Sequence, residues 1–368
     1  MSLSRRKTLA LIGGGVILSA AGGMAAFLGT RTPTRALAPW DAAGVGEEPR
    51  RKALSYALLA PNPHNRQPWL VDLSTPETVV IWRDEDRDLP VTDPYGRQLT
   101  IGMGCFIELM RIAAAEDGYA VDLSLFPQGD AGPVAIAHFS EGAVPDPLFA
   151  HVMSRRSCKE PYRPDAVPAQ AVTALSDHGT VITDPDRITQ LRDLTWRAWL
   201  TEAEDPAAYG ESVDLMRFGR AQIEANPDGI DLGGPMLETL MLAGLLNRES
   251  QRDPSSTGYQ EGVRLYREML TETPAYIVQS SPTNTREDQI AAGAQWLRAN
   301  LAATGLGLAV HPVSQALQEY PAMATHYREA HALLAPEGHT LQMLARLGYG
   351  PEVPRTPRWP LETRMMAT

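Results

Sequence analysis

The alternation of apolar and polar residues predicts a mixed protein of helices and strands. Between residues 47 and 139, short apolar runs of strand length alternate with longer segments of helical period. The predicted elements are a helix around 53–58, strands at 69–73 and 78–82, a helix at 99–117, and strands at 121–126 and 134–139. This order is typical of an α+β unit, in which helices pack on a sheet.

The pattern changes after residue 147. A short helix is predicted at 169–176 and three longer ones at 188–204, 211–226 and 236–247, before the next clear strand at 275–279 and a long helix at 286–304. Helices and loops inserted within a sheet domain often form lids. We therefore predict a helical lid insertion at about 200–270.

One short pattern occurs twice. Aligned without gaps, residues 112–121 and 301–310 share two early alanines, a glycine and a final Ala-Val. The same corner between a helix and a strand is therefore expected in both places. This repeat favours two diverged halves, at 45–146 and 147–368.

Composition restricts the class of partner. The chain has 368 residues, of which 43% are hydrophobic and 21% charged, as in globular proteins. Its formal net charge is −11, and five of its 33 basic residues lie within the first 38, which leaves 28 against 44 acidic residues. Such an acidic body argues against a nucleic-acid partner, whereas one bound phosphate needs only a local basic cluster.

The N-terminus resembles a twin-arginine (Tat) export signal. Arg5, Arg6 and Lys7 precede an uncharged, glycine-rich apolar stretch at 10–29. A small-x-small cleavage site ends at Ala38, but Pro39 is a poor residue for a signal peptidase. Residues 1–38 are thus predicted to be a Tat-type signal or a retained membrane anchor, and the protein to be periplasmic or anchored facing the periplasm.

The amide-rich loop at 60–69 is the first candidate binding element. Pro61 and Pro63 fix the backbone there, and Asn62, Asn65 and Gln67 place three neutral amides on one rigid loop. Such a loop suits a flat heterocycle. The alternative is a proline-rich turn with solvated amides.

A basic cluster at 153–159 is the second candidate. Arg155, Arg156 and Lys159 occur there with Ser154 and Ser157, inside an acidic protein. Cations with serine hydroxyls fit a phosphate dianion. The alternative is a solvated helix end whose cations meet the last carbonyls.

Three motifs resemble the flavin-dependent nitroreductase superfamily. Pro61-x-x-x-Asn65-x-Gln67-Pro68-Trp69 resembles the family's Pro-Ser-Ser/Ala-x-Asn-x-Gln-Pro-Trp, and residues 155–159 resemble its opening Arg-x-Ser-x-Arg/Lys. Residues 355–362, which include Arg358, resemble its closing Lys/Arg-x-Arg-x-Pro-Leu-Glu. The double layout, export signal and insertion are most like the Acg-type FMN-binding proteins.

The resemblance implies a nitroreductase-like fold that binds FMN, and a monomer whose two halves mimic the family's homodimer. It implies that one half supplies the amide loop and the other the phosphate site. It also implies that residues 312–314 lie along the reactive edge of the flavin, with Val313 and Ser314 as backbone donors because proline has no N–H. The implied cofactor-binding residues are Pro61, Asn62, Pro63, Asn65, Gln67, Arg155, Arg156, Ser157, Lys159, Pro312, Val313, Ser314 and Arg358.

Two functions remain open from the sequence. The first is an oxidoreductase that passes electrons through FMN from an unknown donor to a nitro-compound, quinone or similar flat acceptor. The second is an FMN-binding or storage protein whose flavin is covered and does not turn over. The histidines show no zinc-site spacing and no Gly-x-Ser-x-Gly elbow occurs, so neither a metal nor a covalent nucleophile is predicted. The spacing of Cys105 and Cys158 leaves open whether they pair.

Overall fold

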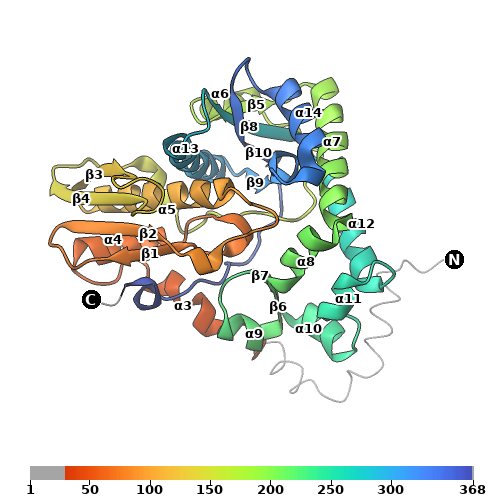
Figure 1. Ribbon diagram of the computed structural model, residues 1–368, viewed down its shortest axis with the longest axis horizontal. Helices are drawn as coiled ribbons and strands as arrows, with labels where there is room; N and C mark the ends of the chain where they lie inside the picture. The colour runs from red at the N-terminus through yellow and green to blue at the C-terminus, as the bar shows by residue number, and fades with distance from the viewer. Residues whose placement is uncertain (1–29, 367–368) are drawn as a thin grey trace.

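Two four-stranded antiparallel sheets, one from each half of the chain, flank a pair of long central helices (Figure 1). The computed structural model describes residues 30–366, so most of the predicted export signal lies outside the described residues. The first half contains α3 (Thr34–Ala42), α4 (Pro49–Ala57), β1 (Trp69–Asp72), β2 (Thr78–Arg83), α5 (Arg97–Glu116), β3 (Tyr119–Leu125) and β4 (Ala135–Glu141). Its sheet has the order β1-β2-β4-β3.

The second half repeats this arrangement. It contains α6 (Ala169–Leu175), β5 (Thr180–Ile182), β8 (Ala275–Ser281), α13 (Arg286–Gly305), β9 (Ala309–Pro312), α14 (Ala324–Leu334) and β10 (Thr340–Gly348), with the sheet order β5-β8-β10-β9. Both halves have the order helix, two strands, long helix and two strands, except that the second half has an insertion between β5 and β8 and the helix α14 between β9 and β10. The corresponding strands take the same places in the two sheets. The prediction of an α+β fold made of two diverged halves is therefore confirmed.

The helices α5 and α13 cross where each has a glycine. A Cβ on Gly104 would lie 2.2 Å from the carbonyl oxygen of Ile290, and one on Gly293 would lie 2.0 Å from that of Ile101. The ungapped alignment of 112–121 with 301–310 also pairs these two glycines and these two isoleucines. The close contact is therefore reciprocal, as in a two-fold dimer interface.

Burial explains why α5 is so apolar. Among the described residues it is the one helix long and apolar enough to cross a membrane, but 83% of its apolar window is buried inside the protein. The alternate residues Val79 and Ile81 of β2 and Ala135 and Ala137 of β4 are buried in the same core.

The chain between β5 and β8 forms the helical insertion. It contains α7 (Pro185–Glu204), α8 (Pro206–Asp214), β6 (Met216–Phe218), α9 (Gly219–Ala225), β7 (Ile230–Leu232), α10 (Pro235–Leu242), α11 (Arg248–Arg252) and α12 (Thr257–Thr271). The prediction of one helix over 211–226 is wrong. The strand β6 interrupts it because residues 216–218 pair in parallel with β7, and Gly219 has a φ of +73°.

The segment after β10 returns to the first half. Arg358 donates its backbone N–H to Ala36 at 2.8 Å, and Met366 donates to Val71 at 2.9 Å. This segment, residues 349–366, is called the C-terminal strap below. Short 3-10 helices complete the fold: η1 (Pro63–Asn65), η2 (Glu85–Arg87), η3 (Pro147–His151), η4 (Ser314–Leu317), η5 (Pro321–Met323) and η6 (Leu361–Arg364).

Candidate cofactor site

The amide loop is held in an unusual backbone conformation. His64, Asn65 and Gln67 have φ values of +46°, +52° and +51°, a region that side chains other than glycine rarely occupy. Asn62 stabilises the loop, because its Oδ1 accepts from the Gln67 N–H at 2.7 Å and its Nδ2 donates to Ala60 O at 3.1 Å. Strained backbone of this kind is common at functional sites.

The side chains of Gln67 and Asn65 bind protein rather than facing an open space. Gln67 is fully buried, donates to Pro227 O at 2.7 Å and accepts from the Trp359 N–H at 2.9 Å. Asn65 donates to Pro357 O at 3.1 Å and accepts from Arg358 Nη1 at 2.7 Å. The expectation that three amides face a heterocycle is therefore wrong for Gln67, whose amide is satisfied at both ends.

Arg358, on the C-terminal strap, uses all its side-chain donors within the protein. Nε donates to Leu58 O at 2.7 Å, Nη2 to Leu59 O and Ala60 O at 3.2 Å each, and Nη1 to Asn65 Oδ1 and to Pro357 O. These carbonyls follow the end of α4, where the helix leaves them without partners. Burial, then the nearby charge of Arg155, lowers the pKa of Arg358 to about 9.

Arg155 lies beside it with donors to spare. Its Nη2 donates to Leu59 O at 3.0 Å, the carbonyl that Arg358 also contacts, whereas its buried Nη1 has no hydrogen-bond partner in residues 30–366. Burial, then the charge of Arg156, lowers its pKa to about 10. Across the described part of the chain, neither Arg155 nor Arg358 pairs with a carboxylate. Two buried cations that no carboxylate bonds directly, with only the charge of Asp231 acting on Arg358, favour an anionic ligand.

The other residues of the basic cluster surround this pair. The Arg156 guanidinium lies 4.5 Å from the centre of the Trp40 ring and donates to Met153 O at 3.0 Å. Ser157 forms a parallel bridge with Val310 of β9, so the cluster runs beside that strand. Lys159 is exposed.

Charges from both halves and the insertion influence one another near Lys159. Burial, then the charges of Lys159 and Arg66, lowers the pKa of His64 to about 4. Burial raises the pKa of Asp231, on β7, while Lys159 and Arg358 act in the opposite direction. Burial first, then Arg346 and Lys159, lowers the pKa of His311 well below its usual value. The amide loop, basic cluster, β9 and insertion thus meet around one site.

The segment 312–314 follows β9. Pro312 pairs with Ala345, and the Val313 N–H donates to Leu344 O at 2.9 Å. Val313 is therefore not a free backbone donor, which corrects the expectation for that residue. Ser314 begins η4, and the first N–H groups of a helix have no partner within it.

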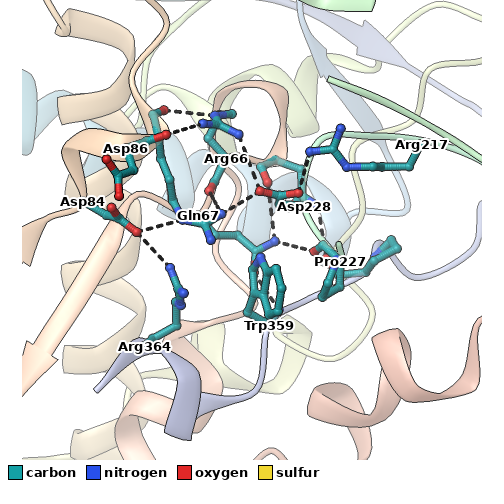
Figure 2. A network of polar contacts seen from close by, with 12 residues as sticks. Arg66, Gln67, Asp84, Asp86, Arg217, Pro227, Asp228, Trp359 and Arg364 are labelled. Carbon is teal, nitrogen blue, oxygen red and sulfur yellow. Dashed lines mark hydrogen bonds and ion pairs between the residues drawn. The ribbon is translucent and has the colours of Figure 1, made fainter. Parts of the chain in front are cut away.

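The insertion is fastened to the amide loop (Figure 2). The Asp228 carboxylate contacts Arg87 at 2.7 Å, Arg217 at 2.8 Å and Arg66 at 3.5 Å. The next residue, Gly229, donates its N–H to Asn65 O at 3.2 Å. The sequence analysis predicted that the insertion is a lid, which stays a prediction, but it did not predict these contacts with the amide loop.

The sequence interpretation also missed Trp40 and Asp231. Trp40 of α3 is buried, donates to Thr356 O at 2.8 Å, and has three arginines near its ring: Arg156, Arg355 and Arg358. Nothing in the local sequence distinguishes it from a core tryptophan. Both cysteines are free and buried.

Comparison with known proteins finds relatives that are named as nitroreductases. No family model matches the chain. A Mycobacterium tuberculosis protein, provisionally named an NAD(P)H nitroreductase, is 25% identical over 327 residues, which cover 84% of this chain and 88% of the relative. The acg protein of that organism, of the same provisional class, is 35% identical over 77 residues, covering 21% of this chain and 23% of its own.

Among solved structures, a provisional nitroreductase from Anabaena variabilis covers 85% of this chain and 91% of its own, with 12% identity and a TM-score of 0.44. Over most of its length the chain is similar to a relative named as a nitroreductase, in agreement with the resemblance of its three motifs to the nitroreductase superfamily. Within that superfamily, the matched 77 residues are similar to the acg protein.

Proposed function

We propose that the chain is an FMN-dependent oxidoreductase that passes electrons through the flavin to a nitro-compound, a quinone or a similar flat acceptor. The observation that carries this proposal is the pair of buried guanidinium groups of Arg155 and Arg358, which meet at Leu59 O with no carboxylate partner in residues 30–366. The FMN phosphate would supply the missing negative charge. Solved nitroreductases with bound FMN have this fold class.

The residues have separate roles in this proposal. Arg155 directs its spare Nη1 to the phosphate, while Arg358 contributes charge and holds the carbonyls of residues 58–60. Ser157 and Lys159 complete the phosphate and ribityl contacts, and the loop at 61–65 forms the wall from the other half. Bound FMN would supply hydride and electron transfer, so no side-chain acid or nucleophile is required. One chain then carries the equivalent of a family dimer.

Flavin content tests this proposal. The purified full chain, after reconstitution with FMN, is expected to release one FMN per chain on denaturation, because it has one basic cluster and one amide loop. Chromatography of the released flavin gives the ratio. Two flavins per chain, or none, would contradict the proposed site.

A storage function is the second candidate, and the fastened insertion favours it. Contacts of Asp228, Gly229 and Pro227 hold the insertion against the amide loop, which would restrict access of donors and acceptors. Residues 1–38 are proposed to direct export or to anchor the protein. NAD(P)H is not supplied outside the cytoplasm, so an exported enzyme would need another donor, such as a quinol or a protein.

Reduction kinetics distinguish enzyme from store. We expect slow reduction of the flavin by NAD(P)H, and faster reduction by reduced viologen in Asp228→Asn than in the parent protein, because that variant loosens the insertion. Asp253→Asn, the same change at an exposed residue of the insertion, is the matched control. Turnover of nitroaromatics or quinones at ordinary enzymatic rates by the parent protein would exclude storage.

A further inference from the structure

Exposed apolar side chains are concentrated at one place, the helix α10 and the turn after it. Met236, Leu242 and Leu245 are 73%, 78% and 54% exposed. They are three of the eight large apolar side chains that are exposed in residues 30–366, and they lie within ten positions of one another. Exposed apolar groups that gather in this way usually mark an interaction surface.

Two apolar side chains of α10 are strongly exposed, although the helix packs on the protein. Its one buried residue is an acid, Glu238, while Met236 and Leu242 are exposed. The Glu238 carboxylate accepts from the Arg220 N–H at 3.0 Å and from Arg31 Nη1 at 3.0 Å. The exposed side of the helix is formed by Met236, Thr239 and Leu242, while Leu237, Leu240 and Met241 are partly buried. In Figure 1 it lies at the edge of the molecule, away from both sheets.

The N-terminal end of the described chain lies against this helix. Arg31 reaches Glu238, and Arg220 Nη1 donates to Thr30 O at 2.6 Å. A cavity of about 590 Å³ lies between the start of α3 and the helices α9 and α10, lined by side chains that include Phe218 and Met241. Residue 30, where the apolar stretch at 10–29 ends, is thus next to α10.

The preceding sequence has the length of a membrane anchor. Residues 10–29 contain no charge, and about 20 helical residues span the roughly 30 Å hydrocarbon core of a bilayer. Two acids next to α10 are paired, because Arg31 contacts Glu238 and Arg35 contacts Glu224. The exposed apolar residues of α10 therefore lie next to the end of the predicted anchor.

We propose that the exposed face of α10, formed by Met236, Leu242 and Leu245, rests in the interfacial region of the bilayer that residues 10–29 enter. This surface rests on the proposed anchor and is independent of the flavin site. In this proposal, contact of α10 with the bilayer holds the insertion, which would cover the cofactor site, at the membrane surface. A lipid-soluble reactant would reach this face from the bilayer.

Depth-dependent quenching tests the proposal in the full chain. A fluorophore is attached to the cysteine introduced by Leu242→Cys or Leu245→Cys. The labelled protein is reconstituted into vesicles of phosphatidylcholine and phosphatidylglycerol that contain nitroxide-labelled lipids. The native Cys105 and Cys158 are only 1% and 2% exposed, so the label is directed to the new cysteine. Val144→Cys, at a residue 83% exposed in the first half, is the control.

We expect several-fold stronger quenching at 242 and 245 than at 144, in vesicles that carry the protein on flotation. Flotation with equal or no quenching at 242 would overturn the membrane-facing surface while leaving the anchor in place. Failure to float would overturn both. The proposal would also be overturned if residue 242 cross-linked to a second copy of the chain and its label was not quenched by lipid. The flavin content of the same samples reports separately on the cofactor site.

Discussion

Separate replacement of Arg155 and Arg358 should give different results, because only one of them has donors available for a ligand. The Arg155 side chain makes one hydrogen bond, to Leu59 O, and that carbonyl also accepts from Arg358. Arg155→Ala therefore leaves no carbonyl without a donor and removes a buried unpaired charge, so the apoprotein should unfold with nearly unchanged free energy. Charge-assisted contacts to phosphate are worth about 1.5–3 kcal/mol, so FMN should bind roughly 10- to 100-fold more weakly. Riboflavin, which lacks the phosphate, should bind as before.

Arg358→Ala should instead destabilise the protein. Leu58 O and Asn65 Oδ1 lose the donors that Arg358 provides, and the end of α4 loses its link to the C-terminal strap. Each buried acceptor left unpaired costs about 1–3 kcal/mol, so the free energy of unfolding should fall by roughly 2–6 kcal/mol. The amide loop is disturbed as well, and both FMN and riboflavin should bind more weakly.

The assays are urea unfolding of the apoprotein and fluorescence titration with each flavin. Arg163→Ala is the control, because its side chain is 67% exposed and its carboxylate partner is Asp165. If Arg155→Ala weakened FMN and riboflavin equally, Arg155 would not contact the phosphate. An Arg358→Ala protein as stable as the parent would refute the structural role assigned to that residue.

Three further predictions concern stability. Gly104→Ala and Gly293→Ala should each destabilise the protein strongly and to a similar extent, because both added Cβ atoms would lie within 2.2 Å of backbone atoms. The control is Gly262→Ala on α12, where the added Cβ meets open space; it should stabilise the protein by about 0.5–1 kcal/mol in the same urea assay. His64, whose pKa in the folded protein is about 4, binds its proton more readily when unfolded. Neutral His64 therefore contributes up to roughly 3 kcal/mol to the free energy of unfolding above pH 6.5, and this contribution is lost as the pH falls toward 4. His64→Asn should make the free energy of unfolding less dependent on pH between 4 and 6.5. Glu202 has the opposite pH dependence. Burial raises its pKa to about 7, although a hydrogen bond from Gln318 acts against this shift. Its contribution to the free energy of unfolding is therefore complete below pH 4.5 and is lost as the pH rises through 7. The Glu202→Gln protein should therefore be more stable than the parent at pH 8. A lower stability at that pH would contradict the view that ionised Glu202 is buried at a cost.

The sequence predicted the elements whose pattern is local. The periodicity of α5 and α13, the alternation in β2 and the proline-bound amide loop all follow from neighbouring residues. By contrast, β10 is built of Leu, Gln, Met and Ala, which favour helices, and it becomes a strand because β8 and β9 pair with it. Long-range pairing also breaks the helix expected at 211–226.

The motif likewise identified Gln67 but not its role. The partners of its side chain are Pro227 and Trp359, which lie 160 and 292 positions away along the chain. The resemblance could indicate that the loop belongs to a flavin site. Which amide meets the ligand and which holds the insertion depends on contacts that no local pattern contains.

These contacts connect the insertion to the proposed phosphate site. Asn65 accepts from Gly229 through its carbonyl and from Arg358 through its side chain, so one residue joins the insertion to an arginine of that proposed site. Opening the insertion must disturb the amide loop that positions Arg358. Because linkage is reciprocal, bound FMN should then close the insertion by the same factor by which closure tightens FMN binding. Asp228→Asn should weaken FMN binding, and FMN should slow amide exchange at 216–232 in the parent more than in the variant. If FMN protected both proteins equally, the insertion and the phosphate site would be energetically independent.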